Sequence, residues 1–159
     1  LVAKKIFIHA AEGDYSLERE TGDWHFYAIN AKAPANVAIG GGRQAVIQKS
    51  LREISEEHST SAHEIHAVVN RESNLRDLFK TAGRLLVSSG KLVIAAEKGL
   101  FTIAELQNAS LAFKGVGPEA SGRFEKWSFT KKEKAGGNAS AETNYSKLVR
   151  QAEKRMLNG

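Results

Sequence analysis

Aromatic rings and positive charges are interleaved in residues 123–132 (RFEKWSFTKK), a combination that suits a single-stranded nucleic acid. In an extended strand, Trp127 and Phe129 would share one face, and Phe124 and Lys126 would share the other. If the first face is open to solvent, its two rings form a platform on which bases stack, at ~1–3 kcal/mol per base. The alternative is that both rings are core residues, which the average burial of large aromatics favours.

The positive surplus of the chain is confined to its last quarter. Residues 121–159 hold nine Lys and Arg against four acids, whereas residues 1–120 hold 14 of each sign, and the whole chain of 159 residues carries a formal charge of +5. A local surplus of this kind attracts phosphate groups. The nucleic-acid-binding residues that we predict are Arg123, Lys126, Trp127, Phe129, Lys131, Lys132, Lys134 and Arg43.

Arg43 is included because it follows three consecutive glycines, residues 40–42, at the start of a predicted helix over residues 44–58. Glycines allow close backbone approach, and a helix N-terminus and a guanidinium both favour a phosphate. Neither a phosphate-loop motif nor a dinucleotide-binding glycine motif is present. A flexible turn before a helix is therefore the simpler explanation of the glycines.

Catalytic and metal-binding patterns are weak in this sequence. His63 and His66 would point to opposite faces of a predicted strand, and no third ligand is spaced to join them, so we predict no metal and no cofactor. Acid–base cleavage of RNA without a metal remains an alternative, although nothing in the sequence brings two of the candidate groups together. These groups are His9, His25, His58, His63, His66, Glu53, Glu57 and Arg43.

The periodicity of apolar residues predicts an α+β fold. Its largely antiparallel sheet would carry two helices packed on one face, because short hairpin connections outnumber long crossovers. The strands are predicted at residues 4–10, 15–20 and 24–30 as a meander, near Ile65, on both sides of a tight turn at Lys98 and Gly99, and at 110–114 and 123–130. The helices are predicted at residues 44–58 and from Ser73 or Asn74 to Gly90.

The domain organisation follows from composition. Residues 1–130 form a single predicted domain, and residues 131–143 lack large apolar side chains and are predicted to be a flexible basic linker. Residues 144–159 repeat apolar side chains at helical spacing and predict an amphipathic C-terminal helix.

The function predicted from these features is non-enzymatic binding of single-stranded DNA or RNA. The alternatives are a small metal-independent ribonuclease and an assembly or adaptor protein that docks on an acidic partner, and a homo-oligomer is also compatible with the sequence. No apolar run approaches the ~20 residues that span a bilayer, so no membrane association is expected. The absence of cysteine is compatible with the reducing cytoplasm, where we predict the protein to reside.

Overall fold

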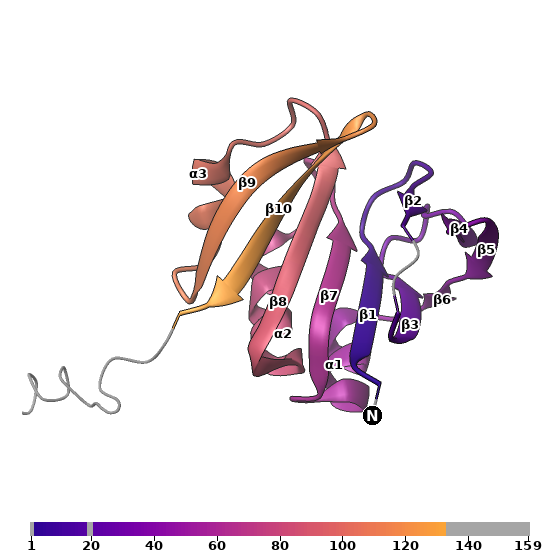
Figure 1. The fold of residues 1–159 in the computed structure, drawn as a ribbon, viewed down its shortest axis with the longest axis horizontal. Coiled ribbons are helices and arrows are strands. Elements are labelled where there is room, and N and C mark those ends of the chain that lie inside the picture. The colour runs from indigo at the N-terminus through magenta and orange to yellow at the C-terminus, as the bar shows by residue number, and fades with distance from the viewer. Residues whose placement is uncertain (1, 19–20, 133–159) are drawn as a thin grey trace, which may run out of the picture.

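A seven-stranded mixed sheet forms the centre of the protein, as the computed structural model shows for residues 2–18 and 21–132 (Figure 1). Its strand order is β6-β3-β1-β7-β8-β10-β9. Strands β6, β3, β1, β7 and β8 run parallel to one another, and β10 runs antiparallel to both β8 and β9. The strands are β1 (Lys4–His9), β3 (Asp23–Ala28), β6 (Ile47–Gln48), β7 (Ala62–Val68), β8 (Leu86–Glu97), β9 (Phe113–Ser121) and β10 (Phe124–Lys131).

The prediction of a largely antiparallel sheet is therefore wrong. The meander expected in residues 4–30 does not form, because β1 and β3 pair in parallel and the segment between them contributes β2 (Ser16–Leu17) to a second sheet. Neighbouring parallel strands need long crossover connections. Here the segment that contains β2 connects β1 to β3, and helices lie in the connections between the later parallel strands. The combination of helices and strands in one fold and the position of β10 agree with the α+β prediction.

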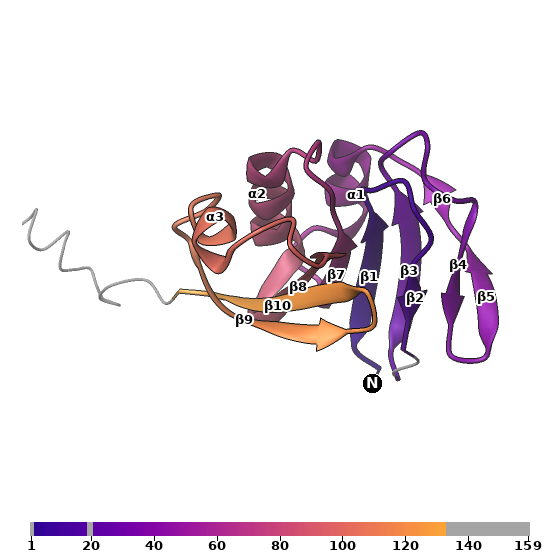
Figure 2. The same ribbon diagram turned by 90° about the horizontal axis from the view of Figure 1, so that it is seen from above.

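Two helices cover one face of the sheet (Figure 2). Helix α1 (Leu51–His58) begins with a capping box, in which the Ser50 hydroxyl accepts from the Glu53 amide at 3.1 Å and the Glu53 carboxylate accepts from the Ser50 amide at 2.9 Å. Helix α2 (Leu75–Leu85) is capped by Asn74, as predicted. It ends before Gly90, which lies within β8.

Two predicted elements are replaced by others. Residues 44–48, expected as the first part of a helix, lie in β5 (Gly42–Ala45) and β6 with Val46 between them, so the helix begins only after the Ser50 cap. The turn at Lys98 and Gly99 is followed by helix α3 (Ile103–Gln107) rather than by a second hairpin strand. Thr102 and Glu105 form another capping box that starts α3.

The face of the sheet opposite α1 and α2 is covered only in part. A small sheet of order β2-β4-β5, with β4 (Asn36–Ile39), packs on the β1 and β3 side through an apolar cluster. That cluster includes Phe7, Tyr15, Leu17, Phe26, Val37 and Ile39. The β8, β10 and β9 side of the same face keeps exposed side chains, so it is the open part of the sheet.

Two further predictions concern regions on which the structure bears little. The C-terminal helix, residues 144–159, and most of the predicted linker, residues 131–143, lie outside the described residues, so the domain boundaries stay a prediction. In the part of the chain that is described, no helix combines the length and apolarity needed to cross a membrane.

Candidate nucleic-acid interface

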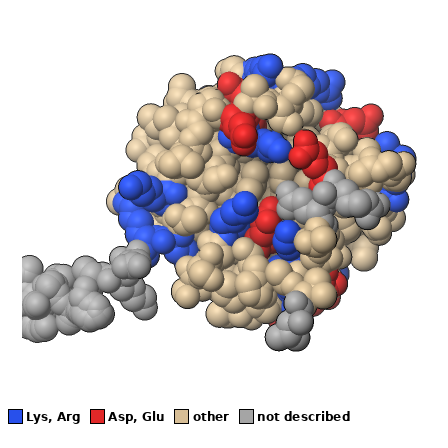
Figure 3. Space-filling view, in the orientation of Figure 1, with Lys and Arg blue, Asp and Glu red and all other residues tan. Residues whose placement is uncertain are grey.

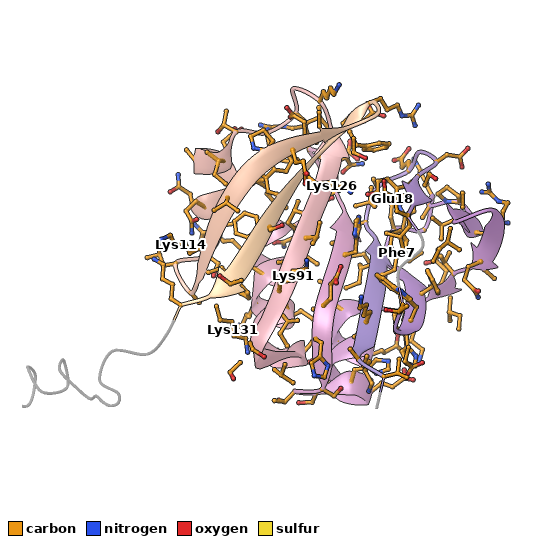
Figure 4. The ribbon with its side chains drawn as sticks, viewed as in Figure 1. Phe7, Glu18, Lys91, Lys114, Lys126 and Lys131 are labelled. Atoms are coloured by element: carbon orange, nitrogen blue, oxygen red, sulfur yellow. The ribbon has the colours of Figure 1, made fainter. Side chains whose placement is uncertain are left out.

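Three lysines project from the open part of the sheet, one from each of its strands (Figure 4). Lys91 on β8 and Lys114 on β9 both lie opposite Thr130 on β10, so they are two strand spacings, about 10 Å, apart. Lys126 lies four residues from Thr130 along β10, about 13 Å away. The alternation of the strands places all three on the face that α1 and α2 leave free.

Acids lie opposite two of these lysines in register, but they form no ion pair with them. Across residues 2–18 and 21–132, no carboxylate forms an ion pair with Lys91, Lys114 or Lys126. Glu64, the nearest acid in register with Lys91, is paired with Lys5 at 3.6 Å. Figure 3 views this face and shows Lys and Arg side chains interspersed with Asp and Glu side chains. Glu64 lies opposite Lys91 and Glu119 lies opposite Lys126, so these acids offset part of the positive charge of the three lysines.

A cleft at the end of the open sheet joins two predicted binding residues that are far apart in the sequence. Arg43, next to the turn of the β4–β5 hairpin, and Arg123, just before β10, line the same cavity of about 290 Å³. Phe124 and Tyr15 also line it. A neighbouring cavity of about 310 Å³ shares Arg123 and Phe124, so Phe124 forms a wall of both.

Both arginines are held in place yet keep free donors. Arg123 donates from Nη2 to the Asp14 carbonyl at 3.2 Å, and its guanidinium lies 5.2 Å from the centre of the Phe124 ring. Arg43 donates from Nε to the Asn36 side-chain oxygen and from Nη2 to the Asn36 carbonyl at 3.4 Å. A guanidinium has five N–H donors, so each arginine can still bind a phosphate.

Phe124 is the aromatic ring of this region that remains accessible. It is half-buried, and its ring packs edge-on against Tyr15 with centroids 4.8 Å apart. Tyr15 is itself fixed by a 2.6 Å hydrogen bond between its hydroxyl and Nε2 of His66. Burial, with the nearby charges of Lys126 and Lys91, lowers the pKa of His66 to about 3, so this buried imidazole is neutral. Tyr15 and His66 thus form a rigid support behind Phe124.

The proposed stacking platform of Trp127 and Phe129 is not present. Trp127 is 1% exposed and Phe129 is fully buried, because both point toward the helix-covered face. Phe129 packs edge-on against Phe79 of α2 with centroids 5.0 Å apart. It also lies against Gly115, where an added Cβ would clash with the Phe129 ring. These two residues are core residues, and the prediction that they stack on bases is wrong.

The remaining predicted residues differ in their surroundings. Lys131 is half-buried and donates from Nζ to the Leu86 carbonyl at 2.7 Å, and burial lowers the pKa of this ammonium. Lys132 is exposed at the end of β10, and Lys134 lies outside the described residues. Arg43 does not precede a helix, because Gly40 and Gly41 form the turn between β4 and β5, where Gly40 has a φ of 60°.

Two histidines that the sequence did not connect lie side by side on the opposite face. The rings of His25 and His58 are 4.7 Å apart. The Lys4 ammonium donates to Nδ1 of His58 at 3.1 Å, so Nε2 carries the proton and donates to the Tyr27 hydroxyl at 2.6 Å. Burial, aided by the charges of Lys4 and His25, lowers the pKa of His58.

No local motif could have revealed this histidine pair, because its members come from β3 and the end of α1. His63 is exposed and His66 buried on β7. Considering only residues that the structure describes, no group of three or more His, Cys, Asp or Glu side chains is arranged to hold a metal ion.

Comparison with known proteins adds no family to this geometry. No protein-family model matches the sequence, and no curated protein is significantly similar to it.

Proposed function

We propose that this protein binds single-stranded nucleic acid without cleaving it, using the open part of its sheet. The observation that supports the proposal is the set of unpaired lysines on that face, Lys91, Lys114 and Lys126, together with the cleft of Arg43 and Arg123 at its end. The Phe124 ring lies between these two groups of cations and provides a surface for a base.

A single strand suits this face better than a duplex does. The cations of the interface lie on strands and a hairpin, and none of them lies on a helix that could enter a major groove. A base can reach the Phe124 ring only if it is not stacked and paired in a duplex. Phosphates would follow the lysines, while bases would stack or remain in solvent.

The proposal is tested by the salt dependence of binding to a labelled oligothymidine. Each phosphate contact that releases a counterion contributes roughly 0.7 to the log–log slope for single strands. Replacing Lys91, Lys114 and Lys126 with Ala should therefore flatten the slope by about 2 if all three lysines contact phosphates.

A matched control is available on the opposite face. Arg76, Lys80 and Arg84 recur at intervals of four on the exposed side of α2, and their replacement removes the same charge. This control variant should keep the native slope. Equal flattening in both triple variants would show that only net charge matters, and flattening in the α2 variant alone would move the interface to the helices.

Metal-independent ribonuclease activity is a second candidate, favoured by the contact between His25 and His58. In such a reaction the half-exposed His25 would take the proton of the 2′-hydroxyl as its oxygen attacks phosphorus. The Lys4 ammonium, held by His58, would protonate the departing 5′-oxygen, which leaves a 2′,3′-cyclic phosphate.

Incubation with labelled RNA distinguishes the candidates. Retention without cleavage supports binding, and neither retention nor cleavage supports an adaptor with an acidic protein partner. Cleavage that is lost in His25→Ala, while the protein stays folded, would replace the binding proposal with the ribonuclease.

A further inference from the structure

A cavity lies at the point of the sheet where an α/β fold tends to hold its ligand. Strands β1 and β7 are adjacent and parallel, and the chain leaves their carboxyl ends in opposite directions, toward β2 from β1 and toward α2 from β7. Such a reversal opens a crevice beyond the strand ends. A cavity of about 350 Å³ occupies it, between residues 11–13 after β1 and residues 69–72 after β7.

The walls of this cavity combine one aromatic ring, small apolar surfaces and several carboxylates. Phe124, Leu100 and Val68 provide the apolar part. Glu12, Glu72 and Glu97 also line it. Within the described ranges, the carboxylates of Glu12 and Glu72 form no ion pair or hydrogen bond, whereas Glu97 lies 3.8 Å from Arg123.

The single cation of this lining, Arg71, forms its ion pair with a carboxylate outside the lining. Arg71 donates to the Leu100 carbonyl at 2.8 Å and to Glu105 at 3.4 Å, and its guanidinium lies 5.0 Å from the centre of the Phe101 ring. Its ion pair is with Glu105 rather than with Glu12 or Glu72, and the lining holds three carboxylates against this one guanidinium. The cavity offers acceptors in excess, so it favours a ligand group that presents donors.

The loops around the cavity are fixed to the sheet before any ligand arrives. The Ser73 hydroxyl donates to the Ala10 carbonyl at 3.1 Å, and the Asn70 side-chain oxygen accepts from the Glu72 amide at 3.0 Å. The Ala11 amide donates to Nδ1 of the buried His9 at 3.4 Å. Both walls are thus formed by the fold itself.

Phe124 connects this cavity to the arginine cleft, because its ring lines both. A nucleotide whose base enters the cavity can therefore stack on Phe124 while its phosphate lies near Arg123 and Arg43. The ion pair between Glu97 and Arg123 lies at the boundary between the acidic cavity and the cationic cleft.

We propose that this cavity selects guanine among the bases of a bound single strand, an inference that rests on the binding function proposed above. Guanine carries the N1–H and the exocyclic N2 amine side by side, so both can donate to the two oxygens of one carboxylate. Thymine and uracil have one N–H between two carbonyls, which the carboxylates repel. Adenine and cytosine place an acceptor beside their amine. Glu12 and Glu72 are the two unpaired carboxylates of the cavity, and one of them takes both guanine donors.

The test compares oligothymidine octamers with and without one central guanine by fluorescence anisotropy. The guanine-containing strand should bind the native protein about 5- to 150-fold more tightly, the range expected for one bidentate base contact. A strand with hypoxanthine in place of guanine lacks the N2 amine and should lose most of this preference. The variants are Glu12→Gln, Glu72→Gln and the double variant, with Glu56→Gln on the exposed side of α1 as control.

The outcomes separate this inference from the binding function. Loss of the guanine preference in the double variant, with oligothymidine binding unchanged and the control native, supports the guanine site. Equal affinity for both strands in the native protein overturns the guanine site and leaves the binding function intact. A guanine preference that survives in the double variant also overturns it. If neither strand binds, the binding function itself fails.

Discussion

Replacing Phe124 with Leu should weaken nucleic-acid binding without unfolding the protein. The ring is half-buried and packs on Tyr15, and Leu keeps apolar contact with Tyr15 while it removes the aromatic face. Loss of one base-stacking contact costs ~1–3 kcal/mol, which is roughly 5- to 150-fold in Kd. The free energy of unfolding should fall by less than the ~3–5 kcal/mol that truncation of a fully buried aromatic costs.

The assay is anisotropy with labelled oligothymidine at one fixed salt concentration, alongside urea denaturation of the same samples. Phe124→Tyr is the matched control, because it keeps a ring that can stack. The reasoning is refuted if Phe124→Leu binds with native affinity. It is equally refuted if Phe124→Tyr loses as much affinity as Phe124→Leu, because then the ring is not what the strand contacts.

Three further predictions concern the fold. Trp127→Ala should lower the free energy of unfolding by ~3–5 kcal/mol, because this ring is buried in the core. The folded fraction of this variant should bind nucleic acid normally. Native stability of the variant in urea would place this ring outside the core. Gly115→Ala should lower the free energy of unfolding by ~1–3 kcal/mol, because the added methyl group overpacks against Phe129. Gly41→Ala should leave the free energy of unfolding unchanged in the same denaturation series, because its added Cβ meets nothing within 4 Å. The folded pKa of His66, about 3, lies below its unfolded value of 6.5. The free energy of unfolding should therefore fall as the pH drops from 6.5 toward 3, by up to ~1.4 kcal/mol per pH unit, because the unfolded state binds the proton first. His66→Gln should make the free energy of unfolding depend less on pH in this range, and an unchanged dependence would show that His66 does not titrate as described.

Local patterns in the sequence predicted the elements whose signals are local. The Asn74 cap and the apolar spacing after it identified α2, and alternation identified β10. The starts of α1 and α3 were also readable, because Ser50 with Glu53 and Thr102 with Glu105 both match the capping-box spacing. Because these caps were not taken into account, the first helix was predicted to start before Ser50, and a hairpin strand was predicted after Gly99.

The pairing of strands that are distant in the sequence could not be predicted from such local patterns. The turn near Gly22 predicted a hairpin, but β1 pairs with β3 in parallel, and only the whole sheet decides that arrangement. On β10, apolar rings occur on both faces, so alternation alone could not say whether Phe124 or Trp127 faces the core. The cleft of Arg43 and Arg123 joins residues eighty positions apart and needed the three-dimensional fold to appear.

Chemical-shift mapping of the backbone amides during titration with an oligothymidine tests the location of the interface most directly. The account predicts that the largest changes fall on the open sheet and its cleft, around Lys91, Lys114, Phe124 and Lys126, while α2 is unaffected. Changes confined to α2, or to the residues around His25 and His58, would contradict it.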